Sequence, residues 1–264
     1  MSLLELDGIG KSYGSVRALE GISLTVAAGQ VHCVLGDNGA GKSTLIKVIA
    51  GLHRHDEGRY LIDGQEVRLS SPKQAMELGI ATVYQDLAVV PLMPVWRNFF
   101  LGAELGTRLR LDVPRMREVT REALARMGID LPDVDRPIGT LSGGQRQCVA
   151  IARAVHFGAR ALVLDEPTAA LGVKQSGVVL TYVAAARDEG LGVVLITHNP
   201  HHAHLVGDHF TLLKRGRMAG SHPRAGITLE QLTTEMAGGS ELAELSHELG
   251  RDRLGPAAGP DPEE

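Results

Sequence analysis

Residues 141–145, with the sequence Leu-Ser-Gly-Gly-Gln, are typical of a helix start that binds an anion. Ser142 and Gln145 stand three residues apart, so their side chains can form a reciprocal capping box on the first turn. Gly143 and Gly144 between them leave backbone amides uncovered. Because bare amides and the helix dipole favour negative charge, this helix start is suited to phosphate.

Two adjacent carboxylates follow further along the chain, directly after the apolar run at 161–164. The run is short and continuous, which predicts a buried strand, and it ends in Asp165 and Glu166. A carboxylate pair at the end of a buried strand is costly unless a metal ion or a reaction uses it. Together with the helix start at Ser142, the pair indicates nucleotide chemistry.

A third motif, at residues 36–43, matches the phosphate-loop pattern G-x-x-x-x-G-K-[ST]. It follows an apolar strand at 31–35 and precedes a helical run at 44–50, which is the context that the motif requires. The glycines allow a backbone curl whose amides point at phosphate oxygens. Lys42 then reaches the β- and γ-phosphates, and the Ser43 hydroxyl becomes a ligand of Mg²⁺.

Three further polar residues have an ordinary interpretation and a functional one. Gln85 follows a strand at 80–84 and is either a surface glutamine or a group that orients water or contacts Mg²⁺ in the ligand crevice of an α/β sheet. His198 follows a strand at 192–196, and its place at a third strand end favours phosphate sensing over the role of a satisfied polar residue. Tyr13 is either a packed loop tyrosine or a ring that stacks on a nucleobase.

Composition restricts the class of protein. A chain of 264 residues allows one large domain or two small ones, and an aromatic content of 3% leaves Val, Ile, Leu and Ala to fill the core. The net charge of −4 gives no general attraction to nucleic acid, so we expect no such partner. Cys33 and Cys148 lie in apolar segments without a spaced framework, which favours a reducing, cytosolic compartment. We expect neither a signal peptide nor a membrane span, since no apolar run approaches ~18 residues.

Hydrophobic periodicity supplies the elements that position these residues. Further strands are predicted at 3–6, 22–26, 59–62, 67–69, 208–214 and 217–219. Helices are predicted at 112–127, 173–187 and 228–236, with a short one that begins at Ser71-Pro72. Tyr13 is placed in a turn after residues 10–12, and no internal repeat or second phosphate loop is found.

Residues 86–157 change to a helical period. Trp96, Phe99 and Phe100 form the richest aromatic cluster of the chain. The cluster is either the core of a small helical subdomain, which we favour for at least two of the rings, or an exposed patch for a partner helix.

Two other segments have a less definite pattern. Four histidines follow His198 closely, but no Cys or carboxylate is spaced with them as a structural zinc site needs. These histidines are His201, His202, His204 and His209. The end of the chain is rich in Glu, Gly, Pro and Asp and has little to bury, so we expect disorder from about residue 255.

In order and approximate spacing, the motifs resemble those of an ABC-transporter ATP-binding subunit. They are residues 36–43, Gln85, residues 141–145, residues 162–166 and His198, and the resemblance covers roughly residues 3–220. It implies an α/β P-loop NTPase fold with a mixed sheet core, an N-terminal antiparallel β subdomain and an inserted helical subdomain at 86–157. The ATP-binding domain would span 1–240, and 241–264 would be an acidic tail.

The same resemblance implies two copies in a head-to-tail dimer that buries ATP and Mg²⁺ at each shared site. Tyr13 would stack on adenine, Glu166 would polarise the attacking water, and His198 would contact the γ-phosphate. The residues implied to bind ATP are Tyr13, Gly36, Asn38, Gly39, Ala40, Gly41, Lys42, Ser43 and Thr44, with Ser142, Gly143, Gly144 and Gln145 of the second copy. The implied catalytic residues are Glu166, His198, Gln85 and Lys42, and the implied metal ligands are Ser43, Asp165 and Gln85.

The implied partners lie at a membrane. Residues 86–157 would dock on transmembrane permease subunits, which places the subunit peripherally on the cytoplasmic face, with an extracytoplasmic solute-binding protein as an indirect partner. One position departs from the family pattern: Gly172 stands where an Asp usually couples the two sites. With Gly172 at this position, the usual coupling between the two sites is not expected, whereas the groups that hydrolyse ATP are all present.

A narrower resemblance, at residues 83–91 and 169–175, is to the ATPases of simple-sugar importers. Many of those fuse two cassettes, whereas this chain has one, as fructose-type members do. The function implied is ATP hydrolysis that energises import of a small solute, most of all a monosaccharide, with an amino acid as an alternative solute. A soluble ABC ATPase acting on DNA ends or ribosomes would need a long coiled coil, or two cassettes and a basic linker. A purely structural nucleotide-binding role conflicts with the presence of Glu166 and His198.

Overall fold

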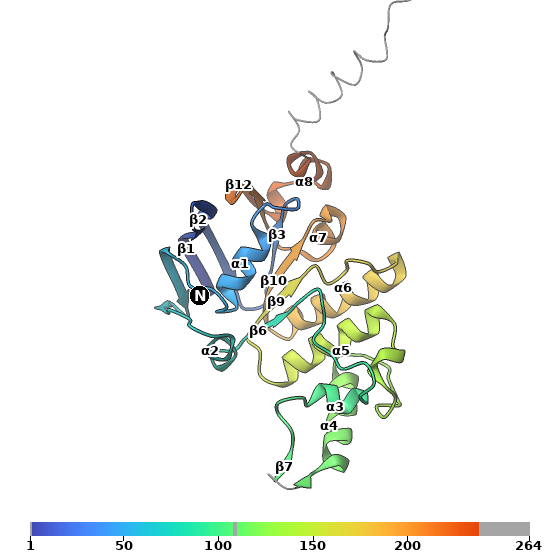
Figure 1. The fold of residues 1–264 in the computed structure, drawn as a ribbon. Coiled ribbons are helices and arrows are strands. Elements are labelled where there is room, and N and C mark those ends of the chain that lie inside the picture. Colours follow the sequence, from blue (N-terminus) through green and yellow to red (C-terminus); the bar gives the residue numbers. More distant parts are fainter. Residues whose placement is uncertain (1, 108–109, 238–264) are drawn as a thin grey trace, which may run out of the picture.

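The computed structural model describes residues 2–107 and 110–237, which form two main sheets with helices around them (Figure 1). The expected disorder from about residue 255 and the acidic tail at 241–264 lie outside the described residues. Among the helices in the described ranges, none has the length and apolar character that crossing a bilayer requires.

A six-stranded sheet forms the centre of the fold. The strand order is β12 (Arg217–Pro223), β11 (His209–Lys214), β3 (Val31–Leu35), β10 (Gly192–Thr197), β9 (Ala161–Asp165) and β6 (Ile80–Val83). Only β12 is antiparallel to its neighbour, so the sheet is mixed as predicted. β3 and β10 are buried along their whole length, as expected for apolar runs covered on both faces.

A four-stranded antiparallel sheet forms the N-terminal part, as predicted. The strand order is β2 (Val16–Ala27), β1 (Ser2–Tyr13), β4 (Glu57–Ile62) and β5 (Gln65–Glu66). Along the second half of β2, buried and exposed residues alternate, because one face of the sheet covers the core and the other meets solvent.

Two local predictions in this sheet are wrong. Tyr13 does not lie in a turn but ends β1, where it pairs with Val16 across the turn at 14–15. The pairing reaches that far because register shifts along β1 absorb its glycine-bearing residues instead of ending the strand. The predicted strand at 67–69 is also absent: the tight turn at 63–64 pairs Ile62 with Gln65, and the ladder ends at Glu66. Leu69 instead packs into the core.

Eight α-helices are described. They are α1 (Lys42–Ile49), α2 (Pro72–Glu77), α3 (Val95–Phe99), α4 (Val113–Arg126), α5 (Gly143–His156), α6 (Val173–Asp188), α7 (Pro200–Val206) and α8 (Leu229–Met236), with single 3₁₀ turns at Ile138–Thr140 and Arg224–Gly226. Asp112, Ser142 and Thr228 each cap a helix with a side-chain oxygen, which explains where α4, α5 and α8 begin.

The segment 86–157 is less uniformly helical than its period predicts. α3, α4 and α5 account for its helices, whereas residues 86–94 form none. A small antiparallel pair, β7 (Gly106–Thr107) with β8 (Arg110–Leu111), also lies between α3 and α4. This pair has only two residues in each strand, which is too short to produce a hydrophobic alternation in the sequence.

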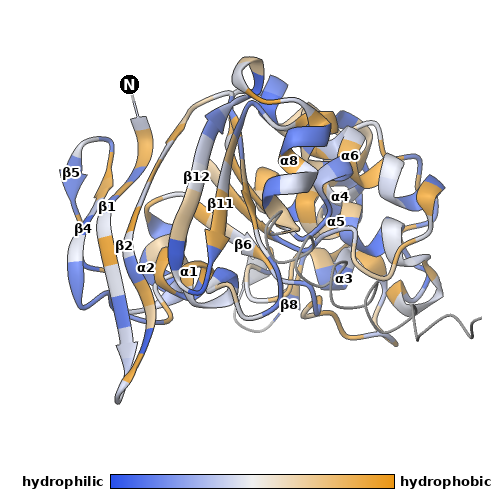
Figure 2. Ribbon diagram, turned by 90° about the horizontal axis from the view of Figure 1, so that it is seen from above, coloured by the Kyte–Doolittle hydropathy of each residue, from blue (hydrophilic) through white to orange (hydrophobic). Residues whose placement is uncertain are grey.

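The large sheet separates two hydrophobic clusters. Val31, Cys33 and Leu35 of β3 contact the cluster that also holds α5, α6 and α7, whereas Val34 contacts the cluster on α1 and the N-terminal sheet. Figure 2 shows the same division, with the β1–β2–β4 strands on one side of β11 and β12 and the helices α4, α5 and α6 on the other. Both faces of the parallel strands are therefore covered, and functional groups are confined to the strand ends.

The aromatic cluster is core. Trp96, Phe99 and Phe100 are all buried, and the two phenylalanine rings lie 5.5 Å apart between centroids. The indole N–H of Trp96 donates to Asp135 over 3.0 Å, which satisfies its polar atom. The exposed-patch alternative is thus wrong for these three rings.

The buried side chain of His32 is expected to make the folding stability depend on pH. His32 is 2% exposed, and its ring contacts the Thr25 carbonyl oxygen at 2.9 Å and the Thr211 hydroxyl at 2.8 Å. The pKa of His32 is lowered from 6.5 to about 4, mainly by burial; the hydrogen bond to Thr25 raises it and the neighbouring His209 lowers it. Because the folded-state pKa lies below the unfolded one, the unfolded chain takes up the proton first as pH falls. We expect this residue to cost about 3 kcal/mol of stability as pH falls through that window.

The measurement is urea unfolding of the wild type and of His32→Gln at pH 7.5, 5.5 and 4.5. The wild type should lose stability more steeply on acidification, with the difference between the two proteins growing below the unfolded-state pKa. Parallel losses in both would assign the acid sensitivity to other groups.

Candidate functional site

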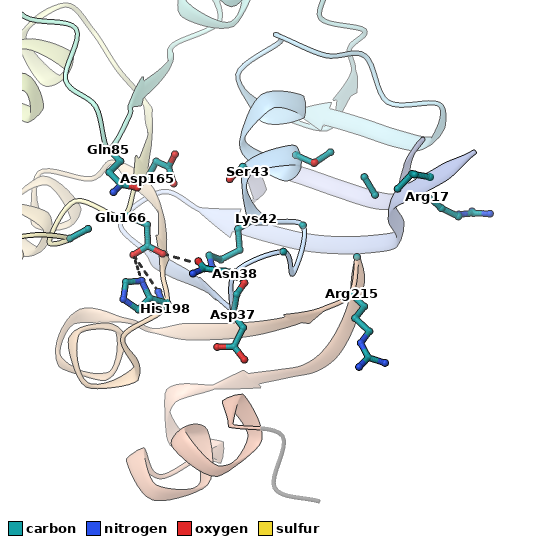
Figure 3. A pocket seen from close by; sticks show the side chains of 17 residues that line it. Arg17, Asp37, Asn38, Lys42, Ser43, Gln85, Asp165, Glu166, His198 and Arg215 are labelled. Atoms are coloured by element: carbon teal, nitrogen blue, oxygen red, sulfur yellow. Dashed lines mark hydrogen bonds and ion pairs between the residues drawn. The ribbon is translucent and has the colours of Figure 1, made fainter. Parts of the chain in front are cut away.

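The carboxyl ends of four neighbouring parallel strands meet at one cavity (Figure 3). β3 leads into residues 36–43, β6 into Gln85, β9 into Asp165 and Glu166, and β10 into His198. The cavity measures about 690 Å³, which is large enough for a nucleotide. The predicted residues that line it are Asn38, Gly39, Gly41, Lys42, Ser43, Thr44, Gln85, Asp165, Glu166 and His198.

The phosphate loop has the curled backbone that its glycines predict. Gly39 and Gly41 have φ values of 81° and 104°, which side chains rarely adopt, and Gly41 caps α1. A Cβ at Gly36 would lie 2.4 Å from the Leu213 carbonyl oxygen, so only glycine fits there. The Lys42 ammonium donates to the carbonyl oxygens of Gly36 and Asp37, at 2.5 and 3.1 Å. The backbone of the phosphate loop thus holds the Lys42 ammonium close to the loop, at the start of α1.

Glu166 is held between two partners. Its Oε2 lies 2.8 Å from His198 Nδ1, and its Oε1 lies 3.8 Å from the Lys42 ammonium. The Glu166 side chain is only 11% exposed, and its backbone has a φ of 47°. A left-handed residue other than glycine is strained, and such strain is common at functional sites.

Asp165 lies beside Glu166 in less compensated surroundings. Burial raises the pKa of Asp165 and the charge of Glu166 raises it further, while Lys42 acts in the opposite direction. Carboxylate, amide and hydroxyl oxygens are the ligands that Mg²⁺ prefers in proteins. Asp165, Gln85 and Ser43 offer these three oxygen types around one cavity, so the donor set fits this ion.

Several predicted residues lie outside this cavity. Gly36 and Ala40 line a second cavity of about 230 Å³ on the other side of the phosphate loop, together with Glu235 and Met236 of α8. Tyr13 is 41% exposed and packs edge-on against His53, with 5.4 Å between ring centroids. Its stacking on adenine stays a prediction.

The helix start at 142–145 has the predicted form but not a place in the same cavity. The Ser142 hydroxyl accepts from the Gln145 N–H, and the Gln145 side chain accepts from the Ser142 N–H, so the capping box is complete. Neither these residues nor Gly143 and Gly144 line the large cavity of their own chain. Their contact with ATP stays a prediction that requires a second copy.

Seven residues of the cavity wall were not among the predicted site residues, although Asp37 lies inside the phosphate-loop motif and Ala169 inside the segment 169–175. The further lining residues are Val16, Arg17, Ala18, Asp37, Ala169, Arg215 and Gly216. Gly216 reaches the cavity because its carbonyl oxygen accepts from the Glu20 N–H and its own N–H donates to Ala40. The turn at 215–216 was predicted, but long-range backbone contacts of this kind leave no local signal.

The histidines after His198 do not form a common site. His202 Nδ1 lies 2.9 Å from the Thr168 hydroxyl, His209 contacts Ser221 at 2.9 Å, and His204 stacks on Phe210. Among the described residues, no group of three or more His, Cys, Asp or Glu side chains could hold a metal ion.

Comparison of this sequence with known proteins identifies a family and several relatives. A family profile described as "ABC transporter" matches residues 19–169. The chain is 41% identical over 253 residues to the xylose/arabinose import ATP-binding protein XylG of Sulfolobus acidocaldarius, which covers 96% of this chain and 98% of the relative. It is 38% identical over 241 residues to the ribose import ATP-binding protein RbsA 1 of Burkholderia cenocepacia, covering 89% of this chain. The chain spans only 46% of that second relative.

Solved structures agree with the sequence comparison. A nucleotide-free ATP-binding cassette from an ABC transporter superposes with a TM-score of 0.77 at 27% identity, over 90% of this chain and 96% of the other. A dimeric cassette in a post-hydrolysis state, bound to ADP and phosphate, superposes with a TM-score of 0.71 at 26% identity. The second match covers 85% of this chain and 100% of the other.

Proposed function

This chain belongs to the ABC transporter family of ATP-binding subunits, and we propose that its ATP hydrolysis energises a membrane permease that imports a monosaccharide. The observation that carries the proposal is the match to a sugar-import ATP-binding protein along nearly the full length of both chains. The site has the groups for the reaction, since Lys42, Glu166 and His198 meet in one cavity at the phosphate loop.

For hydrolysis, the chain must hold the triphosphate in line with a water molecule and offset the charge that develops. The amides of residues 36–43 and the Lys42 ammonium would bind the β- and γ-phosphates. Mg²⁺, held by Ser43, Asp165 and Gln85, would neutralise phosphate charge. The Glu166 carboxylate would accept the proton of the attacking water, while His198 orients that carboxylate through its 2.8 Å contact.

The site would be completed by a second copy of the chain. Ser142, Gly143 and Gly144 lie at the start of α5, outside the cavity of their own chain, so in a head-to-tail dimer this helix start would face the γ-phosphate of the other copy. The similarity to a dimeric cassette with ADP and phosphate supports this arrangement. ATP would then favour the closed dimer, and hydrolysis would release it.

We place the permease contact on the segment that follows Gln85, within residues 86–157. Leu92 is 88% exposed, and Val90, Leu101 and Leu111 are also exposed on this part of the chain. Exposed apolar side chains of this kind favour burial against a partner. The subunit would therefore sit peripherally on the cytoplasmic face of the membrane, with the solute-binding protein on the opposite side.

Leu92→Glu tests this surface. We expect the variant to keep the ATP hydrolysis of the purified chain but to lose about 10-fold or more of its affinity for the permease. The reason is that a charge would replace an apolar side chain that the permease would bury in the complex. Co-purification from membranes measures the association. Leu205→Glu, which changes an exposed leucine on α7, is the matched control. Full association of the Leu92 variant would move the contact elsewhere.

The solute is tested with the assembled transporter. The tagged chain is purified from its own membranes, the co-purifying permease and solute-binding protein are identified, and the complex is placed in lipid vesicles. Pentoses, hexoses and amino acids are then compared as stimulators of ATP hydrolysis. Stimulation by a monosaccharide is the expected result, whereas stimulation by an amino acid alone would replace the sugar assignment and leave the ATPase in place.

A further inference from the structure

Two short segments beyond the strand ends are joined by a pair of histidine contacts. Residues 166–172 run from β9 to α6, and residues 198–202 run from β10 into α7. His198 Nδ1 contacts Glu166 Oε2 at 2.8 Å, and His202 Nδ1 contacts the Thr168 hydroxyl at 2.9 Å. The first contact involves the expected general base, whereas the function described above leaves the second unused.

The segment that Thr168 belongs to has a strained backbone. Glu166 and Ala170 both have left-handed φ values, of 47° and 59°. A short turn closes between them, because the Ala169 N–H donates to the Glu166 carbonyl oxygen at 3.0 Å. Left-handed residues other than glycine persist only where their surroundings hold them. Thr168 is 7% exposed, so its hydroxyl is a buried anchor at the middle of this segment.

The other half of the contact is well fixed. The His202 N–H donates to the Asn199 side chain at 3.1 Å, which caps α7, and the Asn199 N–H donates to the Thr197 hydroxyl at 3.1 Å. Burial lowers the pKa of His202, as do the neighbouring His201 and His198. Nδ1 of a neutral ring accepts a hydrogen bond from the Thr168 hydroxyl when the ring proton is on Nε2, and donates one to it when the proton is on Nδ1. In either tautomer, α7 offers a fixed hydrogen-bond partner to the turn that carries Glu166.

We propose that His202 is a positioning residue for ATP hydrolysis: its hydrogen bond to Thr168 holds the strained turn that aims Glu166 into the cavity. The proposal rests on the proposed function of Glu166 as the general base. His198 then sets the carboxylate at its tip, and His202 sets the backbone from which the side chain starts. The turn also carries Leu171, which packs on Gly143, where an added Cβ would lie 2.7 Å from the leucine Cδ2. The hydrogen bond between Thr168 and His202 would thus also stabilise the contact of residues 166–172 with the start of α5.

The test is ATP hydrolysis by the purified full-length chain. Thr168→Val removes the hydroxyl at nearly constant volume, and His202→Ala removes the ring that it contacts. We expect each to lower kcat by about 10- to 100-fold, with the Kd for a fluorescent ATP analogue within about twofold of wild type, since a misplaced group costs rate rather than binding. The double variant should be about as slow as either single variant, because both remove one bond. Thr168→Ser should restore most of the rate.

Ser221→Ala is the matched control, because it removes a histidine–hydroxyl contact of the same length, that of His209, away from the cavity. It should leave kcat unchanged. Near-normal kcat in Thr168→Val, or losses that multiply in the double variant, would overturn the proposal. A joint fall in kcat, nucleotide affinity and melting temperature that Thr168→Ser fails to reverse would overturn it too, since that pattern is a general packing effect. A wild-type chain that hydrolyses no ATP would instead refute the proposed function.

Discussion

Glu166→Gln is expected to bind ATP with nearly wild-type affinity while its hydrolysis rate falls by about 10²- to 10⁴-fold. The amide has the size of the carboxylate and keeps an oxygen for the contact with His198, which is 2.8 Å away in the wild type. It cannot accept the proton of the attacking water, however, so the loss should fall on kcat. Because ATP would remain uncleaved, the closed dimer should accumulate.

Single-turnover hydrolysis, nucleotide titration and gel filtration with ATP and Mg²⁺ measure the three effects. Glu189→Gln is the matched control, because Glu189 is an exposed glutamate at the end of α6 and lies outside the cavity. Near-normal hydrolysis by the Glu166 variant would remove this residue from the role of general base. A rate loss that appears only as a raised KM would show instead that Glu166 contributes to binding.

The central sheet was predictable because its strands carry their own signal. The apolar runs at 31–35, 161–164 and 192–196 match β3, β9 and β10 within about one residue, since parallel strands buried on both faces must be continuously apolar. The same argument placed Asp165 and His198 at neighbouring strand ends. Local sequence patterns alone were therefore enough to predict that these site residues lie close together.

The antiparallel sheet was less predictable, because its ladder depends on partners far away in the sequence. The strand predicted at 3–6 extends as β1 to Tyr13, through pairing with β2 on one side and β4 on the other. The predicted strand at 67–69 fails for a related reason: a pairing fixed by the turn at 63–64 ends earlier than the apolar pattern does. Local hydrophobicity does not contain the register.

The cavity shows the same limit at the level of single residues. Lys42, Ser43 and Glu166 belong to contiguous motifs, and their chemistry alone identified them. Arg215 and Gly216 enter the wall only because their turn is hydrogen-bonded to residues on β2 and on the phosphate loop. The bond between Thr168 and His202 is likewise a tertiary contact, because the two residues lie 34 positions apart in the sequence.

Lys42→Ala should remove most of the affinity for ATP. The ammonium is buried, is hydrogen-bonded to two carbonyl oxygens of the phosphate loop, and lies 3.8 Å from Glu166. Without it, the phosphates would face Asp165 and Glu166 with one fewer positive charge to offset the repulsion. Truncation of one partner in a buried, hydrogen-bonded charge pair costs about 2–5 kcal/mol, which corresponds to a rise in Kd of about 30-fold to several thousand-fold.

Melting temperatures measured with and without ATP separate a loss of nucleotide binding from a loss of folding stability. Removal of Lys42 leaves the largely buried Glu166 without its cationic partner, so the melting temperature without nucleotide should itself fall, and the shift that ATP causes is measured from each protein's own nucleotide-free value. ATP at about 100 times its Kd stabilises a folded protein by about 2.7 kcal/mol, and the variant should lose that gain at the same concentration. Lys47→Ala, at an exposed lysine in the last turn of α1, should keep it. An unchanged ATP-induced shift in the Lys42 variant would mean that residues 36–43 do not bind the phosphates, because Lys42 is the only lysine among the described residues that line the cavity.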